Sequence, residues 1–127
     1  MTNAEIATAV KNAKSFAKAK EIVRNVLRED KAWQVRTMLF LFERQTAGEQ
    51  SSETTDLRND VGFNSADAMI LTSFAKQWNQ REWLSDKQMG ILGRKITKYA
   101  GQVARKIRGN PAEGKAEEAA ARETAAV

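Results

Sequence analysis

The chain has 127 residues and a net charge of +5, and it contains neither cysteine nor histidine. That length is typical of one domain with a moderate core, and the two missing residue types exclude disulfides, thiolate or imidazole zinc sites and the usual Ser-His-Asp and Cys-His triads. No pair of carboxylates stands out as an acid-base couple, so we predict a protein that is not an enzyme and has no cofactor or metal.

Helix-forming residues dominate, and proline occurs once, at Pro111. No segment alternates for long enough to predict a strand, so we predict an all-α fold, a small bundle of about four helices. The first helix is expected from about Asn3 to Arg28, because Thr2 and Glu5 have capping-box spacing. Asp30 is placed to cap a second helix, residues 31–46, which is apolar around most of its circumference and is expected to be the most buried.

Residues 47–64 are predicted to form a long polar loop, because they hold four acids and one base and end in a Gly-Phe pair. A third helix, residues 65–79, follows with a predicted buried stripe of Met69, Ile70, Phe74 and Trp78. Ser85 and Gln88 form a second capping box and begin a fourth helix that runs to about Arg108. We therefore predict one helical domain over residues 1–110 and a disordered Ala/Glu-rich tail over residues 111–127.

The fourth predicted helix is strongly basic. Between Trp83 and Gly109 lie seven basic residues and one acid. At 100° per residue, four of them form a narrow row opposite the apolar side; this basic row is Lys87, Arg94, Lys98 and Arg105, flanked by Lys95, Lys106 and Arg108. Because no acid follows Asp86 before Glu113, these charges lack partners within the helix, and we predict that they bind a phosphate backbone. A plain solvated helix face is the alternative.

Two further features bear on binding. Trp33 and Trp78 lie on apolar stripes and are expected in the core, whereas Trp83 stands at a helix junction beside Arg81. There it is placed to stack on an unpaired base, or else to pack before the Ser85 cap. Lys11, Lys14 and Lys18 extend the basic surface if the first and fourth helices pack side by side.

The longest strongly apolar run, Met38 to Phe42, is far too short to cross a membrane. The first residues lack the charged-then-apolar layout of a signal peptide. We predict a cytoplasmic protein without a membrane partner.

Three phrases carry a resemblance: "FERQTAGEQ", "NDVGFNSADAMILTSFAKQW" and "WLSDKQMGILGRKITKYAGQ". Together they resemble a short helical module of phage, plasmid and other mobile-element proteins, which occurs alone or attached to DNA-processing proteins such as helicases. The likeness covers about residues 42–102. It implies a mobile-element origin and proximity to nucleic acid, and it brings no catalytic residues.

From these features we predict a small basic nucleic-acid-binding protein, with DNA favoured over RNA. The predicted contacts are Lys87, Arg94, Lys95, Lys98, Arg105, Lys106, Arg108 and Trp83. The alternative is a protein-interaction module, such as a phage inhibitor of a host defence or replication enzyme, or a small helical subunit of a CRISPR-type nucleoprotein complex. In that case the basic face docks on an acidic protein surface.

Overall fold

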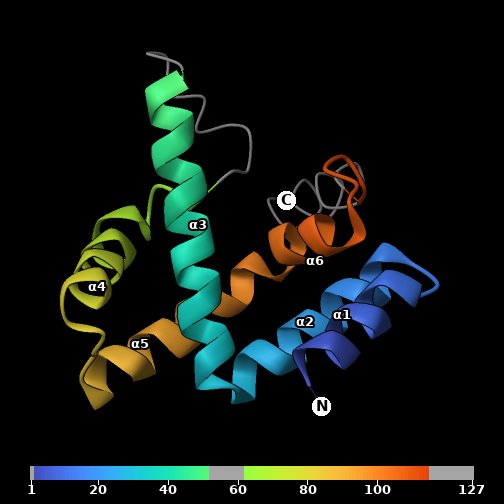
Figure 1. The fold of residues 1–127 in the computed structure, drawn as a ribbon, viewed down its shortest axis with the longest axis horizontal. Coiled ribbons are helices and arrows are strands. Elements are labelled where there is room, and N and C mark those ends of the chain that lie inside the picture. The colour runs from blue at the N-terminus through green and yellow to red at the C-terminus, as the bar shows by residue number, and fades with distance from the viewer. Residues whose placement is uncertain (1, 52–61, 115–127) are drawn as a thin grey trace, which may run out of the picture. The chain divides into compact units, whose positions relative to one another are not determined.

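The computed structural model describes residues 2–51 and 62–114, with the backbone alone for residues 46–51. All regular structure in this part of the chain is helical, which confirms the predicted class (Figure 1). The helices are α1 (Asn3–Asn12), α2 (Phe16–Glu29), α3 (Lys31–Ser51), α4 (Ala68–Arg81), α5 (Asp86–Ile96) and α6 (Ala100–Arg108), with a 3₁₀ turn, η2 (Thr97–Tyr99), between the last two.

Two of the predicted helices are interrupted, which corrects the expectation of about four. The first breaks where Ala13 adopts an extended conformation with φ −60° and ψ 140°, and α2 restarts at Phe16. The fourth breaks at η2 between α5 and α6. Neither break carries a proline. At the first break the Ser15 hydroxyl accepts a hydrogen bond from the Lys18 amide at 3.2 Å and so caps the start of α2.

The helix beginnings follow the local signals closely. Both predicted capping boxes form, Thr2 with Glu5 and Ser85 with Gln88. The Asp30 carboxylate accepts a hydrogen bond from the Trp33 amide at 3.2 Å, as predicted. The second helix extends past its predicted end to Ser51, so residues 47–51 of the predicted loop are helical, while residues 52–61 lie outside the described part.

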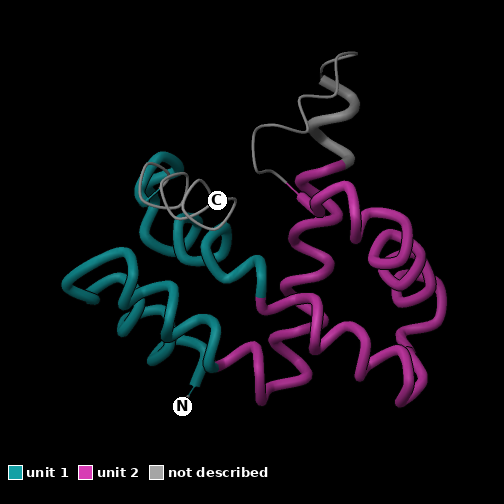
Figure 2. Tube along the Cα trace, turned by 180° about the vertical axis from the view of Figure 1, so that it is seen from behind, with its two compact units in different colours: residues 1–25, 98–127 teal, residues 26–97 magenta. Residues whose placement is uncertain are grey.

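The chain forms two compact units, residues 1–25 with 98–127, and residues 26–97 (Figure 2). Unit 1 packs α1 against α6. Its buried side chains include Ile6, Val10, Val23, Tyr99 and Val103. The side-by-side packing considered for the first and last basic helices is therefore present.

Unit 2 packs α3 against both α4 and α5. Its largest fully buried side chains are Leu27, Met38, Leu41, Leu71, Leu92, Ile96 and Asp67. Within this unit, Gly62 has a φ of +86° and lies against Gln45, whose Oε1 accepts a hydrogen bond from the Phe63 amide at 3.2 Å. Phe63 is 3% exposed. Gly62 and Phe63 therefore anchor this segment on α3.

No helix among the described residues is both long and apolar enough to cross a membrane.

Candidate nucleic-acid interface

The basic row lies on three elements instead of one helix. Lys87 and Arg94 belong to α5 in unit 2, Lys98 to η2 and Arg105 to α6 in unit 1. A 3₁₀ turn advances about 120° per residue instead of 100°, so the register from which the row was predicted does not continue through residues 97–99. The cations are therefore divided between the two compact units.

Arg105 does not face solvent as the helical pattern predicted. It is 6% exposed, its guanidinium lies 4.9 Å from the centroid of the Phe16 ring, and its Nε donates to the Glu113 carbonyl at 2.8 Å. A buried guanidinium needs such partners, because an unpaired buried charge is very costly. Arg105 is a structural residue of unit 1.

Arg108 is similarly committed within unit 1. Its Nη1 donates to the carbonyls of Val10 at 2.8 Å and Ala13 at 3.1 Å, where α1 ends. Its Nε and Nη2 form a two-point ion pair with the Glu113 carboxylate at 2.7 and 2.8 Å. This pair raises the pKa of Arg108 and lowers the pKa of Glu113, chiefly through the hydrogen bonds. Glu113 lies in residues 111–127, which were predicted to be a disordered tail. Its contacts with Arg108 show that the ordered part of unit 1 extends past the predicted end at residue 110.

Lys95, predicted as a flanking contact, forms an ion pair with Asp67 at 3.3 Å. The Asp67 side chain is 1% exposed, whereas that of Lys95 is 34% exposed. Since a buried carboxylate requires compensation, Lys95 is held in place by the fold of unit 2. The turn that leads into α4 is capped by Asn64, whose Oδ1 accepts a hydrogen bond from the Asp67 amide at 2.9 Å.

Lys87 and Arg94 do remain exposed, on one side of α5, with the exposed Gly90 between them. Their seven-residue spacing is two helical turns, or about 10 Å along the axis. A Cβ at Gly90 would meet nothing within 4 Å, so packing does not require glycine there. This face therefore presents two cations separated by bare backbone.

The connection between α4 and α5, residues 82–85, is held at several points. Glu82 has a φ of 52°, and its amide donates to the Trp78 carbonyl at 2.7 Å, which ends α4. The side-chain amides of Gln77 and Gln88 exchange two hydrogen bonds of 3.0 Å. The Gln77 side chain also donates a hydrogen bond to the Trp83 backbone carbonyl at 3.2 Å. The side-chain amide of Gln88 thus joins α4 to α5.

Trp83 projects from this fixed connection with 56% of its surface exposed. By contrast, Trp33 and Trp78 are half-buried. An exposed tryptophan on a well-held backbone is unusual, because burial of such a ring is strongly favourable. The arrangement favours the stacking role over the packing role for Trp83.

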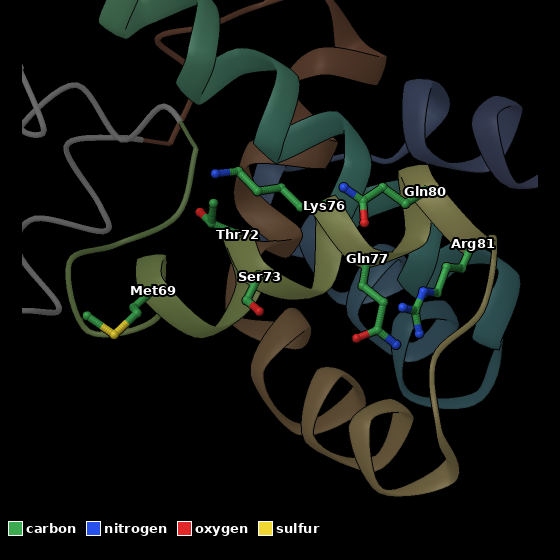
Figure 3. Close-up of a pocket in the computed structure, with 7 residues that line it drawn as sticks. All are labelled: Met69, Thr72, Ser73, Lys76, Gln77, Gln80 and Arg81. Atoms are coloured by element: carbon green, nitrogen blue, oxygen red, sulfur yellow. The ribbon is translucent and has the colours of Figure 1, made fainter.

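A shallow groove of about 500 Å³ runs along α4 and adds cations to this region (Figure 3). Its lining residues all belong to α4: Met69, Thr72, Ser73, Lys76, Gln77, Gln80 and Arg81. No carboxylate lines it. Met69, predicted in the buried stripe, is 88% exposed, because the buried face of α4 is formed by Leu71, Phe74 and Ala75.

We define the Trp83 surface as Trp83 with the exposed cations Arg81, Lys87 and Arg94. All four belong to unit 2. Sequence reasoning identified Trp83, Lys87 and Arg94, and it noted Arg81 only as a neighbour. The cations of α4, Lys76 and Arg81, belong to no basic row in the sequence, so helical spacing gave no signal for the groove.

Among the described residues, no group of three or more carboxylates is placed to hold a metal ion. Lys98 and Lys106 are exposed in unit 1. Comparison of the chain with protein-family models, with curated proteins and with solved structures finds no match.

Proposed function

We propose that the protein binds single-stranded nucleic acid, DNA in preference to RNA, through the Trp83 surface. The observation that carries this proposal is the exposure of Trp83 on a connection fixed by the Gln77–Gln88 amide pair. A ring presented in this way loses little conformational freedom when a base stacks on it. Stacking requires an unpaired base, which favours a single strand over a duplex.

The cations of the Trp83 surface supply the phosphate contacts. Arg81 and Lys87 flank Trp83 in the chain on either side, and both are exposed. Arg94 lies two turns further along α5. Such contacts position a strand without reading its sequence, so the proposed binding has little sequence preference.

The exposed backbone at Gly90 suits close approach of a ligand between Lys87 and Arg94. Glycine in an exposed helix interior costs about 1 kcal/mol relative to alanine. Nothing within 4 Å of the position accounts for that cost. A sugar-phosphate chain lying along α5 does account for it, since a side chain there would hold the strand away.

We extend the proposal to the biological setting, a cytoplasmic protein of a phage or other mobile element. It is supported by the resemblance of residues 42–102, a segment that includes the whole Trp83 surface.

The test is fluorescence anisotropy with a labelled oligothymidylate and with a duplex, each at low and moderate salt. Trp83→Ala should weaken single-strand binding about 5- to 150-fold, the equivalent of about 1–3 kcal/mol for one stacked base. Met69→Ala is the matched control, because it also truncates an exposed apolar side chain of unit 2. Equal affinity of the Trp83→Ala variant and the wild type would refute the stacking role.

A second candidate function is docking of a partner protein on α4. The exposed Met69 at the end of the α4 groove favours it, because flexible thioether side chains are common at adaptable protein interfaces. Under this candidate, Met69→Ala reduces capture of a stoichiometric protein partner, and Trp83→Ala leaves nucleic-acid binding unchanged.

A further inference from the structure

We propose that unit 1 carries a second phosphate-binding surface, the lysine cluster of Lys11, Lys14, Lys18 and Lys106. This inference rests on the proposed function in taking single-stranded nucleic acid as the ligand. It concerns different residues, in the other compact unit, and it assigns them an independent contact with the strand.

Three helix ends meet at this place in unit 1. The Arg108 side chain on α6 joins the end of α1, through the carbonyls of Val10 and Ala13. Arg105 on the same helix lies over the Phe16 ring at the start of α2. Gly114 packs directly against that ring, with no space for a Cβ. The turn between α1 and α2 is therefore held against the end of α6.

Each lysine of the cluster lies close in sequence to one of these anchoring residues, and all four are exposed. Lys11 follows Val10, Lys14 follows Ala13, Lys18 is two residues after Phe16, and Lys106 follows Arg105. The anchoring contacts use backbone carbonyls and arginines. They leave the lysine side chains pointing outward from a fixed base.

The cluster has little acidic compensation. The described part of unit 1 has nine Lys or Arg residues and three acids, Glu5, Glu21 and Glu113. Glu113 is paired with Arg108, and Glu5 belongs to the capping box of α1. Within the described residues, none of the four lysines forms an ion pair. Their charge is available to an external anion.

The start of α2 adds to the positive potential. Helix N-termini favour acidic residues, because the backbone dipole is positive there. The first turn of α2 has no acid, and it carries Lys18 instead. A lysine in the first turn is mildly unfavourable for the isolated helix, because its charge and the helix dipole repel each other there. An anion bound at this end would be attracted by both.

The occupant we assign is a sugar-phosphate backbone. Lysine ammonium groups on flexible stems act as point charges and bind phosphates without the fixed geometry of an arginine fork. No aromatic side chain of the described part of unit 1 is exposed, so the cluster offers charge without stacking. A strand that engages this cluster as well as the Trp83 surface binds more tightly through effective concentration.

The experiment compares two charge-reversed triple variants. One replaces Lys11, Lys14 and Lys18 with Glu. The other replaces Arg28, Lys31 and Arg36 with Glu; these are exposed cations of unit 2, so the net charge changes equally. Each is titrated with a labelled oligothymidylate of about 40 nucleotides, longer than the usual site of about 4–16 nucleotides, over a range of salt concentrations. Trp83→Ala is measured in parallel.

The association constant K falls as salt rises, and loss of three phosphate contacts makes the plot of log K against log salt less steep by about 2. At 0.1 M salt this corresponds to binding that is about 100-fold weaker. We expect this of the lysine variant and a less than tenfold effect of the control variant. Equal effects of the two triple variants would overturn the lysine cluster. Should the reversal unfold unit 1, the Lys→Gln version of the same triple removes the charges and is expected to show the same change in slope.

The outcomes separate the two proposals. The expected change in slope of about 2 in the lysine variant, together with wild-type affinity of Trp83→Ala, supports the cluster and refutes the stacking role of Trp83. If the lysine variant keeps the wild-type slope and Trp83→Ala loses affinity, the cluster alone is refuted. If the wild-type protein binds no strand at low salt, both proposals are refuted. Polyglutamate serves as a second probe: if the lysine variant loses polyglutamate binding and keeps DNA binding, the cluster docks acidic proteins, and the proposal is overturned.

Discussion

Two glycines on α5 offer a controlled test of how the helix is packed. Gly90 and Gly93 are both in the interior of the helix, and in each case Ala is favoured by about 1 kcal/mol from helix propensity alone. Their surroundings differ. A Cβ at Gly90 meets nothing within 4 Å, whereas a Cβ at Gly93 would lie 3.3 Å from Nε2 and 3.4 Å from Oε1 of Gln34.

Gln34 has little freedom to move. It is 5% exposed, and its Nε2 donates to the Leu27 carbonyl at 2.7 Å. Displacing it weakens a buried hydrogen bond, at a cost of about 1–3 kcal/mol if the donor is left unpaired. We therefore expect Gly90→Ala to stabilise unit 2 by about 0.5–1 kcal/mol and Gly93→Ala to be neutral or destabilising by up to about 2 kcal/mol, the difference of the two effects.

Thermal and urea unfolding followed by far-UV circular dichroism measures both variants. For a chain of this size, 1 kcal/mol corresponds to a shift in Tm of about 3–5 °C. Equal stabilisation by the two substitutions would refute the reasoning, because the Gln34 contact would then impose no constraint. In the anisotropy assay, Gly90→Ala should also bind a single strand more weakly than the wild type, so stability and affinity change in opposite directions.

Two other predictions concern anchoring contacts. Phe63→Ala should destabilise unit 2 by about 3–5 kcal/mol, since it removes a buried ring, and it should lower the unfolding midpoint; Met69→Ala, at an exposed position, is the control, and equal midpoints would contradict the anchoring role. The ion pair with Arg108 lowers the pKa of Glu113. The pair therefore stabilises the folded protein fully above the ordinary carboxyl pKa of about 4.3, and this stabilisation is lost as the pH falls through the lowered pKa. The wild type should therefore have a higher free energy of unfolding than Glu113→Gln near neutral pH, and this difference should disappear in acid. A difference that does not depend on pH would contradict the ion pair.

The amino-acid sequence by itself determined the class of the fold and the places where helices begin. The Thr2 and Ser85 capping boxes and the Asp30 cap depend on residues within three positions of one another. Such contacts are readable because they are local. The exposed Lys87, Arg94 and Trp83 were also identifiable, as charge and aromatic character at a helix junction are visible in the chain.

Tertiary structure decided which basic residues are available for binding. Arg105 and Arg108 have the same helical pattern as their neighbours, yet the packing of α6 on α1 turns both inward, to Phe16 and to the carbonyls at the end of α1. Lys95 is similarly committed, because Asp67 is buried 28 residues away in the chain. These outcomes depend on contacts between distant segments, for which helical periodicity contains no signal. The same packing leaves Lys11, Lys14 and Lys18 exposed, while the two arginines hold the helix ends together.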